Sequence, residues 1–182
     1  MFAENRESFY TFFFQKLIRK IQLNFHSHST LIKRAFYKGI IMRLWHKDFL
    51  TILPRFQLLG QWRECCLIAK NISEKGTPNH ILVNKIMDYP IEHFYAYTCL
   101  IKDEMGNRGY KCDFSKFSKW IDINENHNPI TIEELFKNWH NEEYRQICYW
   151  NLKEKYLCGG TTKEEWIPIA EYMKNVLPIP IL

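Results

Sequence analysis

The chain has 182 residues, the length of one domain with room for an appendage, and its 46% hydrophobic content is enough for a sizeable core. No run of eighteen apolar residues occurs, which excludes a membrane-spanning helix. The six cysteines form no CxxC pair and follow no signal peptide. We therefore expect reduced thiols, a cytoplasmic location, and neither a metal nor another cofactor.

The formal charge of +5 is concentrated at the start of the sequence. Residues 1–41 hold seven of the 25 basic and two of the 20 acidic side chains, so residues 42–182 hold 18 of each. Net charge therefore gives no support for DNA binding, and only the charge distribution can. Residues 42–75 carry six basic and three acidic side chains, which fits either a DNA-facing side or ordinary surface.

Residues 1–41 have three interpretations. A basic amphipathic helix for a membrane surface or a partner is one, because apolar residues recur every four positions at Phe9, Phe13, Leu17, Ile21 and Phe25. A targeting peptide is disfavoured by its acidic residues, Glu4 and Glu7. We favour the third, that translation begins at Met42, since Lys38-Gly39 can be encoded as a purine-rich ribosome-binding sequence. The prediction is an extension, 1–41, and a helical domain, 42–182.

A helix opened by Pro54 is predicted next. Helical spacing gives it a core face, made of Leu58, Trp62, Cys65 and Ala69. A second face carries two amides, a glycine and a carboxylate, at Gln57, Gly60, Gln61 and Glu64. Spacing alone is typical of a solvated face, but a glycine among polar side chains also suits the close approach of a polar ligand.

The order Met42-Arg43-Leu44-Trp45, followed by QLLGQWRE from Gln57 to Glu64, resembles the pyrimidine-dimer DNA glycosylases of the phage endonuclease V type and their bacterial relatives. The resemblance continues weakly through Asn79-His80 and Asn107-Arg108-Gly109-Tyr110, and fades near residue 115. It implies an all-helical fold and two essential groups, the α-amine of the N-terminal residue and a glutamate in an Arg-Glu pair. Arg63-Glu64 matches that pair, and Met42 falls at the amino-terminal position.

The resemblance implies Met42 and Glu64 as catalytic residues, and Arg43, Arg63, Gln57, Gln61 and His80 as DNA-binding residues. The amine would attack C1′ of a damaged nucleotide, expel the base and cut the strand through an imine. An α-amine has a reference pKa near 7.7–8.0 against about 10.4 for lysine, so it is the better nucleophile at neutral pH. In a chain that keeps residues 1–41 the nitrogen of Met42 is an amide and cannot form an imine.

The remaining elements are also helical or irregular. A loop is predicted over Asn71–Asn79, then a helix from Pro90 to Asn107 that ends at Arg108-Gly109. Its buried face is formed by Phe94, Tyr97, Ile101 and Met105. Residues 111–130 are expected to be irregular, with a loop at Asn124–Pro129. Thr131 is expected to cap a helix that has Glu133 and Glu134 in its first turn.

Two further helices are predicted near the end of the sequence. One runs from Glu142 to Tyr156 and is stopped by Gly159-Gly160. The other is capped by Thr161 or Thr162, runs from Lys163 to Asn175, and buries Trp166, Ile169, Ala170 and Met173. The closing VLPIPIL is expected to be extended because of its prolines. With no strand pattern, the expected fold is an all-α, compact single-domain helical bundle with long irregular loops.

The functional prediction is a monomeric DNA-repair glycosylase and AP lyase, acting on damaged double-stranded DNA. The alternative is a non-catalytic nucleic-acid or protein interaction module on the same scaffold, which is favoured if residues 1–41 are retained. A third option is a glycosidic-bond enzyme on a modified or free nucleoside. His46 and Asp48 lie close to the motif without the spacing of a metal site.

Overall fold

The computed structural model describes residues 42–123 and 129–176, and these are helical without any strand. The predicted all-α fold is confirmed. The interpretations of residues 1–41, most of the Asn124–Pro129 loop and nearly all of the VLPIPIL ending fall outside the described residues.

Helices α3 (Arg55–Lys75) and α4 (Ile91–Asn107) pack against each other through the two predicted core faces. All eight residues of these faces are buried. Helix α3 starts after Pro54 and continues to Lys75, where Gly76 ends it with a φ of 70°. The loop predicted from Asn71 is therefore wrong at its beginning. Asn71 remains helical because its buried amide donates to the Pro78 carbonyl (3.0 Å), which folds the following loop back onto the helix.

The second helical pair consists of α6 (Glu142–Leu157) and α7 (Lys163–Val176), with bounds close to those predicted. The Asn141 side chain caps α6, and Gly159 follows it with a φ of 76°. Thr162 caps α7, since its hydroxyl accepts from the Glu165 N–H (3.3 Å). Of the predicted stripe on α7, Ile169 and Met173 are fully buried, whereas Trp166 and Ala170 are partly buried.

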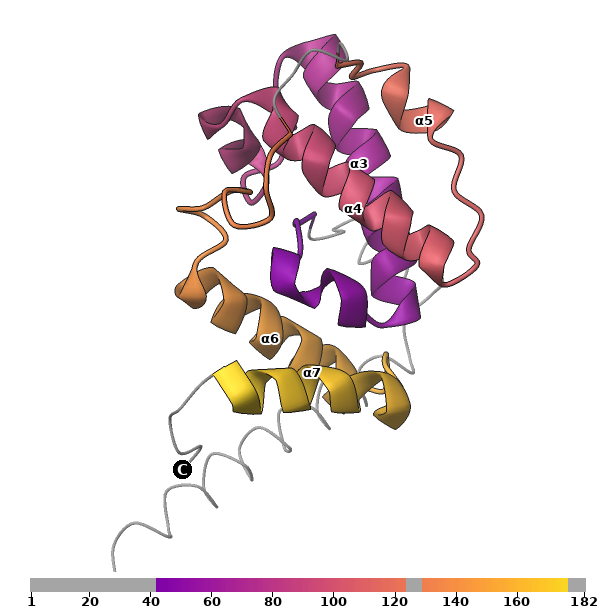
Figure 1. Cartoon of the computed structure of the whole chain (residues 1–182), viewed down its shortest axis with the longest axis vertical. Coiled ribbons are helices and arrows are strands. Elements are labelled where there is room, and N and C mark those ends of the chain that lie inside the picture. The colour runs from indigo at the N-terminus through magenta and orange to yellow at the C-terminus, as the bar shows by residue number, and fades with distance from the viewer. Residues whose placement is uncertain (1–41, 124–128, 177–182) are drawn as a thin grey trace, which may run out of the picture. The chain divides into compact units, whose positions relative to one another are not determined.

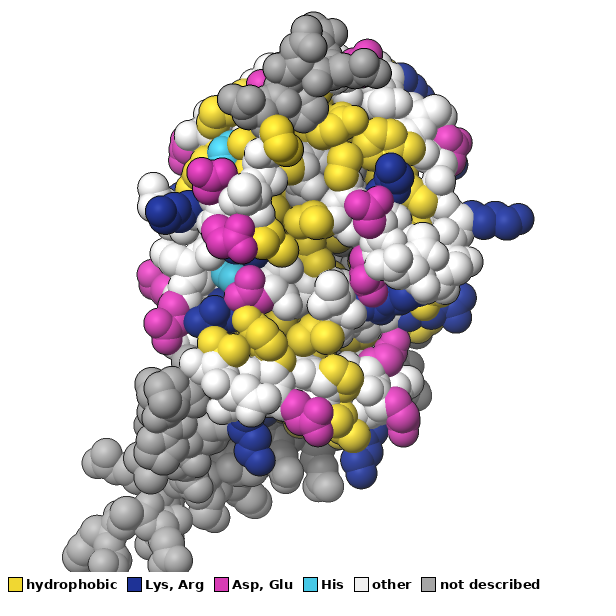
Figure 2. All heavy atoms as spheres, in the orientation of Figure 1, with side chains coloured by type: hydrophobic (Ala, Val, Ile, Leu, Met, Phe, Trp, Pro, Cys, Tyr) yellow, Lys and Arg dark blue, Asp and Glu magenta, His cyan; other side chains and the backbone are white. Residues whose placement is uncertain are grey.

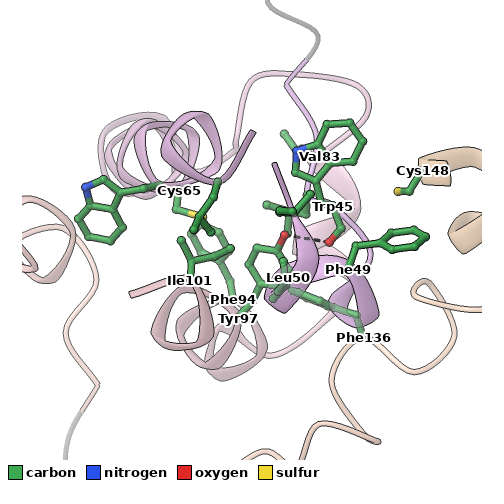
Figure 3. Packing of buried hydrophobic residues seen from close by; sticks show 14 of the residues in the cluster. Trp45, Phe49, Leu50, Cys65, Val83, Phe94, Tyr97, Ile101, Phe136 and Cys148 are labelled. Atoms are coloured by element: carbon green, nitrogen blue, oxygen red, sulfur yellow. Dashed lines mark hydrogen bonds between the residues drawn. The ribbon is translucent and has the colours of Figure 1, made fainter. Parts of the chain in front are cut away.

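Between these pairs lies the 3-10 helix η1 (Lys47–Ile52), which contacts both α4 and α7 and is drawn in indigo in Figure 1. Phe49 and Leu50 of η1 point into the buried core, between Ile101 of α4 on one side and Cys148 of α6 on the other (Figure 3). Among the described residues, the buried core runs from Leu44 to Met173.

Three short elements were not predicted from sequence: η1, the 3-10 helix η2 (Asn84–Asp88) and helix α5 (Ser115–Ser118). Helix α5 lies within the stretch expected to be irregular. Its Phe117 is fully buried and meets Phe94 of α4 edge to face, with ring centroids 5.6 Å apart. Phe117, the buried Ile121 and the Phe114 ring stacked on Trp62 therefore anchor this part of the chain to the core.

The helix predicted after Thr131 does not form, and the residues make a run of turns instead. Thr131 does accept from the Glu134 N–H (3.3 Å), as a helix cap would. The ammonium of Lys47, however, takes the carbonyls of Ile132, Glu133 and Leu135 that a helix would use for its own hydrogen bonds. Phe136 then adopts a φ of 48°, outside the right-handed helical region.

All six cysteines are free, three of them partly buried, two buried and one exposed. No helix among the described residues is both long enough and apolar enough to cross a membrane.

We expect Lys47→Met to lower the free energy of unfolding by about 2 kcal/mol, because its ammonium bonds three carbonyls that no other described group serves. Urea unfolding measures the change. Lys70→Met is the control, since Lys70 is exposed and its ammonium makes only weak surface contacts, with Glu74 on the same helix and with the Trp120 ring (5.8 Å). Equal stability of the two variants would contradict the role given to Lys47.

Candidate active site

Glu64 lies in the middle of α3 and faces the chain segment that precedes η1. Its carboxylate accepts a hydrogen bond from the backbone N–H of Arg43. Met42 directly precedes Arg43, and consecutive Cα atoms are about 3.8 Å apart. The Met42 nitrogen is therefore one residue along the backbone from the N–H that the carboxylate binds. Met42 itself is partly buried and packs against the core. The structure therefore brings together the two positions that the sequence marked as catalytic.

Burial raises the pKa of Glu64 from its ordinary value of 4.5 to about 7. The Arg43 N–H, the Arg43 guanidinium and the Lys155 ammonium each act in the opposite direction and offset only part of that effect. At neutral pH the protonated and ionised forms are therefore both present, which is the condition for a side chain that must both give and take a proton.

The Arg43 side chain lies over the Trp45 ring, with the guanidinium carbon 5.2 Å from the ring centroid. It also interacts with the thiol of Cys148 on α6 and lowers the pKa of that thiol, although burial is the larger effect and raises the pKa to about 11. Arg43 thus joins Glu64 on α3 to the facing side of α6, and places a positive charge beside the carboxylate.

Helix α6 supplies the far side of the site. Tyr144 donates its hydroxyl hydrogen bond to the Leu44 carbonyl (2.6 Å), and the Lys155 ammonium acts on Glu64 through its charge. Sequence reasoning missed both residues. The spacing of Tyr144, Cys148 and Lys155 at i, i+4 and i+11 places them on one helical face, which is the signal that was available.

The polar face of α3 is buried at Gln61 and partly buried at its other three positions. Gln61 is buried, and its carbonyl oxygen accepts from the Trp45 N–H (3.0 Å) while its amide contacts the Cys65 sulfur (3.8 Å). Its side chain is therefore occupied inside the protein and does not face a ligand. The carbonyl oxygen of Gln57 is buried without a partner among the described residues. A Cβ at Gly60 would meet nothing within 4 Å, which leaves open space beside Glu64.

The other two predicted DNA-binding residues lie elsewhere. Arg63 is exposed on α3, so its guanidinium is available to a phosphate. His80 is half-buried in the loop before η2, where its hydrogen bonds are to residues 82–84 at the end of the loop and the start of η2. The structure thus places Arg63 on the surface next to Glu64 in the sequence, and gives His80 a local role in shaping its loop.

A polar network fixes the start of η1 to α6 and α7. The Asp48 carboxylate accepts from Tyr172 (2.7 Å) and from Arg145 (3.1 Å). Burial opposes ionisation of Asp48, but these hydrogen bonds and the nearby His46 and Arg145 outweigh it and lower its pKa. His46 stacks on His140 with ring centroids 5.2 Å apart, and burial lowers the pKa of both rings. The predicted near-site polar residues therefore brace the segment that carries Met42.

No three His, Cys, Asp or Glu side chains come together as metal ligands within residues 42–123 and 129–176. On the face drawn in Figure 2, acidic and basic side chains are interspersed around apolar ones.

Residues 42–118 match the family model of the pyrimidine dimer DNA glycosylases. The resemblance predicted from the sequence is confirmed over these residues, which begin at Met42 and end with α5. Helices α6 and α7 lie outside the match to the glycosylase family. Comparisons with curated proteins and with solved structures gave no significant match.

We expect Glu64→Gln to raise the free energy of unfolding above pH 7 by about 1–2 kcal/mol. The Glu64 pKa is about 7 in the folded protein against 4.5 ordinarily, so the folded state binds more protons between these values. Stability of the wild type therefore falls as pH rises through that window, and the glutamine variant escapes the loss. The measurement is urea unfolding from pH 4 to 8.5.

Glu74→Gln is the matched control, because Glu74 is exposed on the same helix and pairs with Lys70 across one turn (3.8 Å). Its stability difference from the wild type should stay within about 0.5 kcal/mol at every pH. A Glu64→Gln protein with the wild-type pH dependence would show that Glu64 titrates normally.

Proposed function

We propose that the chain beginning at Met42 is a DNA glycosylase and AP lyase that acts on damaged pyrimidines in double-stranded DNA. One observation carries the proposal: a carboxylate with a pKa of about 7 accepts a hydrogen bond from the backbone next to Met42. The family match over the same residues supports it. An amine and a carboxylate side by side are the two groups that an imine mechanism at C1′ requires.

In the first step the neutral amine of Met42 attacks C1′, so that a nitrogen–carbon bond forms as the bond to the base breaks. The base leaves with the electron pair and takes up a proton. Proton transfer to the ring oxygen then opens the sugar and leaves a protonated imine between Met42 and C1′. Loss of a proton from C2′ breaks the bond between C3′ and its oxygen, and the 3′ phosphate leaves. The strand is cut without any oxidant or metal.

Glu64 serves as the acid and base in these transfers, and its negative charge stabilises the cationic sugar. Its raised pKa keeps both protonation states accessible at neutral pH. Arg43 and exposed Arg63 bind phosphates, for which the guanidinium geometry is well suited. The target nucleotide must be turned out of the stack to bring C1′ to the amine, and the open space at Gly60 lies on the same helix face as Glu64.

The proposal requires that the active form begins at Met42. In a chain that retains residues 1–41 the Met42 nitrogen is an amide, which has no free pair to attack C1′. Arg43 is too bulky for efficient removal of a preceding methionine, so a chain started at Met42 keeps the amine in place. The retained extension instead favours a non-catalytic binding module on the same scaffold.

Borohydride trapping tests the proposal. Protein started at Met42 and the full 182-residue chain are each incubated with a duplex that contains an abasic site, and the imine is reduced. We expect a covalent adduct only with the Met42-started protein, located at Met42 by peptide mass. Trapping of neither folded form would contradict the amine mechanism and favour the binding module.

The assignment of Glu64 has its own test in the Met42-started protein. Glu64→Gln should nick ultraviolet-irradiated duplex at least a hundredfold more slowly than the wild type, because the proton transfers lose their acid and base. Glu74→Gln is the control on the same helix. A Glu64→Gln protein that nicks at the wild-type rate would exclude the assigned role.

A further inference from the structure

The backbone of Arg43, Leu44 and Trp45 is held by side chains rather than by a helix. The Arg43 N–H is bound by Glu64, as described above. Tyr144 donates to the Leu44 carbonyl (2.6 Å) and Tyr97 to the Trp45 carbonyl (2.8 Å), the latter drawn as a dashed line in Figure 3. Gln61 accepts from the Trp45 N–H (3.0 Å). Side chains of α3, α4 and α6 therefore hold this segment from three directions.

The hydrogen bonds of Gln61 and Tyr97 to this segment are buried, and that of Tyr144 is part-buried. Leu44 has no exposed surface, and Gln61 and Tyr97 are buried with it. Burial raises the pKa of both tyrosine hydroxyls well above the ordinary value, so each remains protonated and able to donate. A buried carbonyl without a donor is costly, which makes a single geometry of the segment strongly preferred.

A nucleophile at the end of a chain has a specific problem, because chain ends fray unless they are tied down. An attacking nitrogen must lie about 3–3.5 Å from its carbon with the right direction, and a misplacement of 1 Å can cost a hundredfold in rate. The carbonyl that Tyr144 binds lies two residues after Met42. Its hydroxyl therefore holds the backbone at a point close to the proposed amine, next to the Arg43 N–H that Glu64 binds.

We propose that Tyr144 is a positioning residue for the Met42 amine: its hydrogen bond to the Leu44 carbonyl fixes residues 42–44 so that the amine lies beside Glu64. This inference rests on the proposed function. It assigns to α6, which the family match does not include, a part in building the site.

The test is Tyr144→Phe in the Met42-started protein, with Tyr149→Phe as the matched control. Tyr149 is a buried tyrosine on the same helix whose ring stacks on Trp166 and whose described contacts are those of the ring. We expect Tyr144→Phe to slow single-turnover adduct formation on an abasic duplex at least tenfold, while the Kd for that duplex changes less than twofold. Tyr149→Phe should change neither quantity beyond twofold.

Two further readouts separate positioning from general destabilisation. Amide exchange at Trp45 in the full chain should accelerate in Tyr144→Phe and stay unchanged in Tyr149→Phe. Tyr97→Phe, which frees the Trp45 carbonyl, should show the same split between rate and Kd, and it serves as the second variant if Tyr144→Phe does not fold.

The outcomes are distinguishable. A wild type that is never trapped overturns the proposed function and the inference together. A trapped wild type with Tyr144→Phe at the same rate overturns the inference alone. A parallel loss of rate and DNA affinity in Tyr144→Phe, or equal losses in Tyr149→Phe, would likewise overturn it, because a positioning role predicts a selective loss of rate.

Discussion

The site depends on the hydrogen bonds that fix the backbone of residues 43–45. Four hydrogen bonds to their backbone come from Glu64, Gln61, Tyr97 and Tyr144, which lie on three different helices. Backbone groups in a buried segment must all find partners. Here the partners are side chains, and they fix the position of the segment. The same hydrogen bonds place Met42, the residue before the segment, near the Glu64 carboxylate.

This arrangement disfavours the ionised form of Glu64, which lowers the stability of the folded protein at neutral and higher pH. Burial opposes its ionisation, and the nearby Arg43 and Lys155 charges recover only part of the loss. A protein selected for stability alone would place an apolar or amide side chain there. A carboxylate whose pKa is strongly raised by burial is found more often at functional sites than at structural positions.

The second helical pair, α6 and α7, contributes contacts to the site formed by residues 42–118. Helix α6 contributes the Tyr144 hydrogen bond to the Leu44 carbonyl and the Lys155 charge near Glu64, and α7 holds η1 through the hydrogen bond from Tyr172 to Asp48. Residues 42–118 match the glycosylase family, whereas these contacts come from later in the chain. The match therefore covers the proposed chemical groups, while the geometry that holds them depends on residues beyond it.

Sequence alone was sufficient for features whose physics is local or carried by a motif. The core faces of α3 and α4 follow from helical spacing, the bounds of α6 and α7 from their caps and glycines, and the family match over residues 42–118 from its motif. The tertiary structure decided what depends on distant partners. Lys47 turned a capped helix into turns by binding its carbonyls from 85 residues away. Gln61 is buried by a bond to Trp45, and Tyr144 reaches Leu44 across 100 residues. A hydrogen bond between remote residues leaves no periodic trace in a sequence, so only the folded chain reveals it.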